Sequence, residues 1–198
     1  MAPDVSIIVV NQDCREHTLA CLDAVRAATS KVFYELIVVD DKSSDGSPSA
    51  LRERQPEAMV IALREPVGFA AACNQAARQA KGRYILVLDA AAVVQDGAID
   101  RLVAFADCTP DARVWGGRSL AADGSVTTRS CAGQMTPWRL LCQALGLSAL
   151  FPDRSLFNGE VYGGWLRDSE RVVDIVSSSL LLIKAGFWRQ LNGFDPDL

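Results

Sequence analysis

The sequence predicts an α/β fold in which a mostly parallel sheet carries helices on both faces. In the first half of the chain, short apolar runs alternate with segments whose apolar residues have helical spacing. The connections between these segments are short, which is typical of parallel strands joined by right-handed crossovers. The second half has weaker periodicity and predicts a small antiparallel, loop-rich region.

Four apolar runs predict the parallel strands. Residues 5–10 and 35–40 are short and rich in β-branched side chains, as strands buried on both faces usually are. Residues 58–63 and 83–88 predict the third and fourth strands, because each is a short apolar run bounded by polar residues or glycine.

Helices are expected between these strands. Residues 17–28 have apolar residues at helical spacing, and residues 68–82 predict an alanine-rich helix closed by Gly82. Ser47 is expected to cap a helix whose first residue is Pro48. Asp96 is expected to cap a helix that reaches about residue 106.

The second half of the chain predicts shorter elements. Residues 114–128 predict a strand, a hairpin turn at Asp123 and Gly124, and a return strand. Residues 130–171 resemble a substrate-side loop, within which residues 138–152 have two interpretations, a helix on a membrane surface and a partly buried helix. Residues 171–198 predict a strand and a short helix.

Composition indicates one globular domain. The chain has 198 residues, of which 49% are hydrophobic and 22% charged. Its net charge of −4 argues against a nucleic-acid-binding protein, which needs a basic face. We interpret the six cysteines as reduced thiols of a cytoplasmic protein. Residues 1–10 lack the basic region of a signal peptide, and no apolar run is long enough to span a membrane.

Polar residues follow the predicted strands at the points where they end. Asn11 follows the first strand, Asp40 and Asp41 the second, and Asp89 the fourth. In open α/β sheets, ligands bind at the carboxyl ends of strands where the strand order reverses. Carboxylates there can bind a ribose or a base, and two together can hold Mg²⁺ or Mn²⁺ against a diphosphate. Solvated turns and helix caps are the alternative interpretation of these acids.

Motifs of several other enzyme classes are missing from the sequence. Neither a GxGxxG motif nor a GxxxxGKS/T motif follows the first strand, which disfavours dehydrogenases and P-loop enzymes. A serine hydrolase of the α/β class needs a GxSxG motif and a late histidine, whereas the single histidine is His17. One histidine and no CxxC pair also disfavour a zinc site.

Four blocks of the sequence, VSIIVVN, ELIVVDDKSSDGS, VGFAAACNQAARQAKGRYILVLDAAAVVQDGAIDRLVAF and LLIKAGFWRQLNGFD, resemble family-2 glycosyltransferases of the GT-A fold. The bacterial rhamnosyltransferase-like group is the most similar. This resemblance implies a single GT-A-like domain over residues 1–198. Residues 1–106 would form its nucleotide-binding half, and residues 107–198 an acceptor-side half that is incomplete at its C-terminal end.

The resemblance also implies roles for individual residues. The end of the first strand would lie against the nucleotide, the acids after the second strand would contact the base, and the GFA block would lie near the diphosphate and in helix packing. These residues are Val10, Asn11, Asp40, Asp41, Gly68, Phe69 and Asn74. Arg118, Arg129 and Arg167 are either diphosphate ligands or surface charges, and Trp138 and Trp165 are either sugar platforms or core residues.

Two departures from the family pattern bear on catalysis. The metal motif would begin at Asp89, but its last acid falls on Ala91, which cannot coordinate a cation. Mg²⁺ or Mn²⁺ is expected for the family, and one carboxylate would weaken this binding. The resemblance places the general base after the GFDPDL segment, whereas the sequence stops at Leu198 and Asp195 matches the preceding block. The catalytic base is therefore unassigned.

The resemblance implies inverting transfer of a sugar from a UDP- or dTDP-linked donor to a carbohydrate or lipid-linked acceptor, with little turnover in this chain. A non-catalytic nucleotide-sugar-binding or regulatory module that partners an active transferase is the alternative. A nucleotidyltransferase-like relative is disfavoured, because no Gly- and Arg/Lys-rich segment follows the first strand. We also expect a cytoplasmic location, in one interpretation at the inner membrane face, and a homodimer formed through an exposed apolar face.

Overall fold

The computed structural model describes residues 2–121, 123–127, 130–151, 154–157, 159, 161–162 and 165–197. The chain forms two compact units, which we describe separately. The sheet unit comprises Met1–Trp115 and Ser178–Leu198, and the loop-rich unit comprises Gly116–Ser177.

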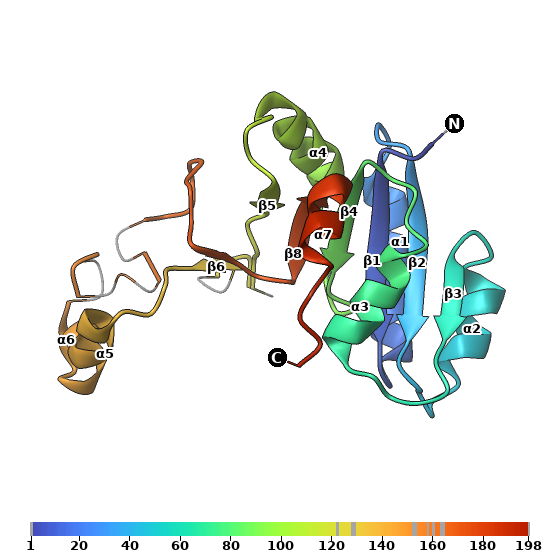
Figure 1. Cartoon of the computed structure of the whole chain (residues 1–198), viewed down its shortest axis with the longest axis horizontal. Helices are drawn as coiled ribbons and strands as arrows, with labels where there is room; N and C mark the ends of the chain where they lie inside the picture. The colour runs from blue at the N-terminus through green and yellow to red at the C-terminus, as the bar shows by residue number, and fades with distance from the viewer. Residues whose placement is uncertain are drawn as a thin grey trace. The chain divides into compact units, whose positions relative to one another are not determined.

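A six-stranded sheet with the strand order β3-β2-β1-β4-β8-β5 organises the fold (Figure 1). The pairs β1/β2, β1/β4 and β2/β3 are parallel, whereas β8 runs antiparallel to β4. The prediction of a mostly parallel sheet is therefore confirmed. The strands are β1 (Val5–Asn11), β2 (Tyr34–Asp40), β3 (Met59–Ala62), β4 (Tyr84–Leu88), β5 (Val114–Gly116) and β8 (Leu180–Lys184).

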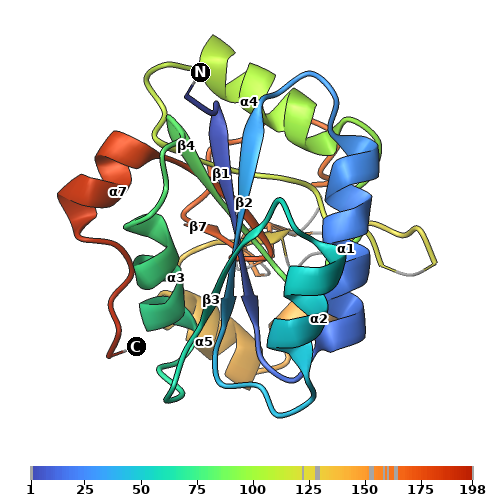
Figure 2. The ribbon, with the colours of Figure 1, turned by 90° about the vertical axis from the view of Figure 1, so that its right-hand side faces the viewer.

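Helices cover both faces of the sheet, as predicted. Figure 2 shows α1 and α2 on one side of the strands and α3 and α7 on the other. The helix α4 shares a buried apolar cluster with α1 and therefore packs on the same face. The helices are α1 (Arg15–Ala28), α2 (Ser47–Arg54), α3 (Phe69–Ala77), α4 (Ala98–Cys108) and α7 (Ala185–Leu191).

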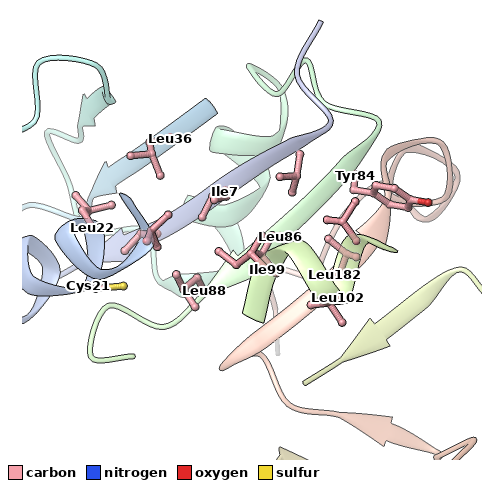
Figure 3. Packing of buried hydrophobic residues seen from close by; sticks show 14 of the residues in the cluster. Ile7, Cys21, Leu22, Leu36, Tyr84, Leu86, Leu88, Ile99, Leu102 and Leu182 are labelled. Carbon is pink, nitrogen blue, oxygen red and sulfur yellow. The ribbon is translucent and has the colours of Figure 1, made fainter. Parts of the chain in front are cut away.

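The core follows from the two-residue period of the strands. Ile7, Leu86 and Leu182 lie on neighbouring strands and pack with Leu22 of α1 and Ile99 of α4, and all five side chains are fully buried (Figure 3). Burial of one such side chain contributes about 1.5–3 kcal/mol. The alternate residues Ile8, Ile37, Val39, Ile85 and Val87 are buried as well, so β1, β2 and β4 read as continuous apolar runs.

Two predicted helix caps are wrong by one residue. Gly46, with a φ of 80°, is the N-cap of α2, so Ser47 is the first helical residue and Pro48 the second. Gly97, with a φ of 64°, and not Asp96, is the N-cap of α4. In both cases a glycine in the left-handed conformation turns the chain into the helix, and such a conformation favours glycine over serine or aspartate.

The prediction that Gly82 closes a helix is also wrong, because α3 ends at Ala77. Gly82 instead passes close to β1, where its N–H donates to Ser6 Oγ at 2.8 Å. A Cβ atom at this position would lie 2.6 Å from the backbone nitrogen of Ser6. Close approach between two backbones, and not a cap, therefore requires glycine here.

The described residues of the loop-rich unit form short elements. Its strands β6 (Cys131–Ala132) and β7 (Ile175–Val176) pair antiparallel, and its helices are α5 (Pro137–Ala144) and α6 (Leu147–Leu150). The predicted turn at Asp123 and Gly124 is confirmed, although the flanking chain forms only a single bridge, between Leu120 and Val126. Across the described parts of the chain, no helix is both long and apolar enough to cross a bilayer.

Candidate functional site

The carboxyl ends of β1, β2 and β4 meet at one edge of the sheet. Asn11 pairs with Asp40 across β1 and β2, and Val9 pairs with Leu88 across β1 and β4, which places Asp89 beside the end of β1. Successive strands are added on one side of β1 up to β3, and β4 is then added on the other side. This edge is therefore the switch point at which open α/β sheets bind ligands.

The side chain of Asn11 is fully buried in a hydrogen-bond network. Its Nδ2 donates to Asp40 Oδ1 at 2.7 Å and to Ser43 Oγ at 2.9 Å, and its Oδ1 accepts from Thr18 Oγ1 at 2.6 Å. The second oxygen of Asp40 accepts from the N–H of Ser43 at 3.0 Å. Asn11 and Asp40 thus join the ends of β1 and β2, and their side chains hydrogen-bond to other groups of the protein.

Asp41 fastens the segment that leads into α3. It is buried, and its two carboxylate oxygens accept from the N–H groups of Val67 at 2.7 Å and Gly68 at 2.9 Å. Gly68 adopts a φ of 83° at the N-cap of α3 and is exposed, with open space where a Cβ would lie. Asp41 therefore fixes the backbone beside the carboxyl ends of β1, β2 and β4, the part of the sheet that we call the rim.

A second set of contacts joins the loop after β1 to the loop after β2. Asp13 donates its N–H to Ser43 Oγ at 2.9 Å, and its Oδ1 accepts from the N–H of Ser44 at 2.7 Å. Arg15 donates its N–H to Asp45 Oδ2 at 3.0 Å. The hydrogen bond from Ser47 holds the pKa of Asp45 below its ordinary value. Sequence reasoning missed this pairing, although the polar segment after β2 marked one of the two loops.

The side chain of Asp89 is exposed at this edge. Its Oδ1 accepts from the N–H of Ala91 at 2.8 Å, and its backbone is held by Ser179 O at 3.1 Å. The other carboxylate oxygen makes no hydrogen bond to a described residue. Ala91 is exposed as well, so the position where the resemblance expects a second acid presents only a methyl group.

At the position of the expected metal motif, the described residues offer a divalent metal one carboxylate, that of Asp89. In the described residues, no group of three or more His, Cys, Asp or Glu side chains is placed to hold a metal ion. Cys21 lies beneath Asp89, but burial and the neighbouring carboxylate raise the pKa of this thiol to about 12. A protonated thiol is a poor metal ligand. These residues do not form a protein metal cage.

Of the remaining candidates in the sheet unit, two pack against the segment after α7. The ring of Phe69, 43% exposed, stacks on Phe194 with 6.2 Å between the centroids, and the side chain of Asn74 binds the backbone of Phe194. Val10 is partly buried at the end of β1. The structure brings Val10, Asn11, Asp40 and Asp89 to the strand ends and places Asn74 against a different segment.

Three of the candidates in the loop-rich unit, Trp138, Trp165 and Arg167, have partners within that unit. Trp165 lies within 5.1 Å of the Arg167 guanidinium, measured to the ring centroid, and Arg167 is itself buried with its guanidinium near Cys131 and Val161. Trp138 is half exposed and donates to Leu156 O at 3.0 Å. Arg118 is exposed, whereas Arg129 lies outside the described residues.

The sheet order and the polar strand ends define a GT-A fold. Residues 6–151 match the family Glycosyl transferase family 2, and the chain therefore belongs to this family of glycosyltransferases. The succinoglycan biosynthesis protein ExoO of Rhizobium meliloti (strain 1021) is 30% identical over 106 residues, which are 53% of this chain and 30% of that protein. The matched part of the chain thus spans less than a third of the length of this relative.

Solved structures show the same fold. The mannosyltransferase PcManGT from Pyrobaculum calidifontis, in complex with GDP-Man and Mn²⁺, matches all of this chain with 49% of its own, at 20% identity and a TM-score of 0.66. S. aureus TarS 1-349 in complex with UDP matches 98% of this chain with 51% of its own, at 18% identity and a TM-score of 0.66.

Proposed function

We propose that this chain is the nucleotide-sugar-binding part of an inverting glycosyltransferase that uses a UDP- or dTDP-linked donor and a carbohydrate or lipid-linked acceptor. Membership of family 2 supports sugar transfer. Structural neighbours in complex with UDP and with GDP-Man support a nucleotide-linked donor. A relative in succinoglycan biosynthesis supports a polysaccharide as the product. Residues 1–106 form the nucleotide-binding half and residues 107–198 the acceptor-side half.

The observation that carries this proposal is the pre-formed edge at the ends of β1, β2 and β4. Asn11, Asp40 and Asp41 are buried and hydrogen-bonded inside the protein, so they hold the rim in one conformation before a ligand arrives. The nucleotide then lies against this rim at Val10, with the base beside the loop after β2. A rim already held by internal hydrogen bonds loses little conformational entropy on binding.

The exposed oxygen of Asp89 is the group at this edge that meets the donor. It accepts a hydrogen bond from a ribose hydroxyl or occupies one coordination position of a Mg²⁺ or Mn²⁺ ion that is otherwise bound by diphosphate and water. Gly68 and Phe69 lie at the start of α3 and face the diphosphate. Asn74 holds this helix in place through its hydrogen bonds to the backbone of Phe194. No catalytic step is assigned to the metal, since the chain supplies one carboxylate.

The second candidate function is a non-catalytic module that binds a nucleotide-sugar or regulates an active transferase. Ala91 favours it, because turnover is weakened where a methyl group replaces a metal-binding carboxylate. The two functions differ in turnover and share donor binding. Restoring the acid with Ala91→Asp, together with the base-bearing segment that the family carries after GFDPDL, and then measuring sugar transfer separates them, since a binding module stays inactive.

The experiment that tests the common part is a thermal-shift panel with UDP, dTDP, GDP and ADP, each with and without Mn²⁺. A ligand that binds only the folded state raises the melting temperature by mass action. We expect a shift with one pyrimidine nucleotide that is lost in Asp89→Asn. The matched control Asp96→Asn removes another exposed acid, at the opposite end of the segment that connects β4 to α4. Equal shifts with all four nucleotides, or none, would contradict the proposal.

Location and assembly follow as further parts of the proposal. The chain acts in the cytoplasm at the inner face of the membrane, where α5 exposes apolar side chains at Trp138, Leu140 and Leu141. Flotation with anionic vesicles tests this contact, and Leu140→Ser with Leu141→Ser should abolish it.

The chain is also proposed to form a homodimer. Light scattering tests this assembly, and a monomer at all concentrations would exclude it.

A further inference from the structure

A pocket of about 420 Å³ lies at the sheet edge opposite the strand ends described above. Its lining includes Arg83, Tyr84, Arg113, Lys184, Phe187 and Gln190, and we call it the basic pocket. Tyr84 begins β4 and pairs with Lys184, whereas Leu88 ends β4 and pairs with Leu180. Tyr84 in the basic pocket is therefore about 17 Å from Asp89 along the chain at 3.3 Å per residue, and Figure 3 shows Tyr84 and Leu88 at opposite ends of this strand.

Only one of the three cations of the basic pocket is neutralised by acids. The guanidinium of Arg83 donates to both oxygens of Asp107, at 2.5 and 2.9 Å, and to Asp4 Oδ1 at 3.1 Å. Among the residues that the structure describes, neither Arg113 nor Lys184 forms an ion pair. Two positive charges that form no ion pair with a described residue thus flank one hollow of a protein whose net charge is −4.

Neutral groups hold these two cations in place. Arg113 donates to Gln190 Oε1 at 3.3 Å, and its guanidinium lies 5.1 Å from the centroid of the Phe187 ring. Lys184 Nζ donates to Pro110 O at 2.5 Å and lies 5.7 Å from the centroid of the Trp115 ring. Carbonyl, amide and aromatic partners orient the cations and leave their charge uncompensated, so each keeps further N–H donors for a ligand.

We propose that the basic pocket binds an oxyanion of the phosphate class between Arg113 and Lys184. This site is separate from the donor edge, by which we mean the carboxyl ends of β1, β2 and β4 where the nucleotide-sugar is proposed to bind. An oxyanion supplies the missing negative charge and accepts charge-assisted hydrogen bonds from both side chains. The ring of Phe187 forms an apolar wall beside it, on which an organic group attached to the phosphate can pack. Free phosphate and the phosphate of an organic ester share this chemistry.

The test is a pair of NMR titrations in which ¹⁵N-labelled protein receives inorganic phosphate or phenyl phosphate. We expect saturable shifts of the amide signals of Phe187 and Gln190. The variant Arg113→Gln/Lys184→Gln should weaken binding by about tenfold or more, because two charge-assisted contacts are lost. The control Arg78→Gln/Lys81→Gln removes one arginine and one lysine, both exposed and outside the pocket, and should leave affinity within about twofold.

The two ligands distinguish the source of the oxyanion. Tighter binding of phenyl phosphate that is lost in Phe187→Ala identifies an organic phosphate, whereas equal affinities identify free phosphate. Arg113→Lys/Lys184→Arg keeps both charges and should retain binding even if the glutamine variant is poorly folded. Equal weakening by the pocket and control variants, or shifts that do not saturate, would overturn the proposal. Neither result depends on nucleotide binding at the opposite edge.

Discussion

Asn74 of α3 binds both backbone polar groups of Phe194, a residue 120 positions later in the chain. Its Nδ2 donates to Phe194 O, and its Oδ1 accepts from Phe194 N–H, each at 2.8 Å. The ring of Phe194 packs at 4.7 Å from Trp188 of α7, between ring centroids. One amide side chain therefore fastens the segment after α7 to α3 and connects the two chain segments that make up the sheet unit.

Asn74→Ala should lower the free energy of unfolding by about 1–3 kcal/mol, because two hydrogen bonds are lost and the backbone of Phe194 is left without these partners. Urea denaturation measures the change. Gln79→Ala, at an exposed position just after the same helix, is the control and should change stability by less than about 0.5 kcal/mol. Equal effects of the two substitutions would show that the Asn74–Phe194 contact contributes nothing.

Gly82→Ala should destabilise the fold, because its new methyl group would lie 2.6 Å from the backbone nitrogen of Ser6 in the central strand. Overpacking against backbone costs about 1–3 kcal/mol. Gly186→Ala in α7 is the matched control, since nothing lies within 4 Å of its added Cβ. That substitution should be neutral or stabilise by up to about 1 kcal/mol. Thermal unfolding of the two variants checks the contrast, and a neutral Gly82→Ala would contradict it.

Asp100 should make stability depend on pH. Burial raises its pKa, but hydrogen bonds from the N–H groups of Ser30, Lys31 and Val32 outweigh burial, so the pKa of Asp100 lies below its ordinary value. A depressed folded-state pKa stabilises the fold above the unfolded-state value of about 3.9, and this contribution is lost as pH falls through the folded-state pKa. Asp100→Asn should therefore be less stable at pH 7 and converge with the wild type in acid.

Urea denaturation between pH 7 and pH 2 measures this difference. The control Asp96→Asn removes an exposed carboxylate just before α4, whose side chain caps nothing. Its stability should follow that of the wild type at every pH. A constant gap between Asp100→Asn and the wild type down to the lowest pH would show that the charge of Asp100 is not the source of its contribution.

The parts of the fold that sequence predicts are those set by local pattern. The apolar runs of β1, β2 and β4 and the polar residues at their ends are visible because both follow from burial and strand period. The contacts of Asp41 with Gly68 and of Asn74 with Phe194 are not visible, since each depends on how distant segments meet. The loop-rich unit is the least predictable part, because its strands and helices are too short to carry a period.

The helix caps show why local pattern fails in detail. Ser47 and Asp96 are good capping residues by type. However, Ser47 directly follows Gly46 and Asp96 directly precedes Gly97, and in each case the chain turns into the helix at the glycine. Ser47 is the first residue of α2 and its N–H donates to Asp45 Oδ1 at 2.9 Å, so Ser47 lies inside the helix and does not cap it. Asp45 is itself held by the N–H of Arg15 at 3.0 Å, a contact between distant segments that local pattern does not reveal.

Ala91→Asp should strengthen Mn²⁺ binding at the donor edge by roughly tenfold or more, because ligand charge count tunes divalent-cation affinity. Ala91 is exposed, and its N–H already binds Asp89 Oδ1 at 2.8 Å, so the new carboxylate lies on the same turn as the old one. Val93→Asp, at a position 70% exposed, adds the same charge farther along and is the control. Mn²⁺ titration by electron paramagnetic resonance in the presence of UDP measures both. Asp89→Asn/Ala91→Asp should lose the gain, and equal binding by Ala91→Asp and Val93→Asp would mean that Asp89 does not mark a metal edge.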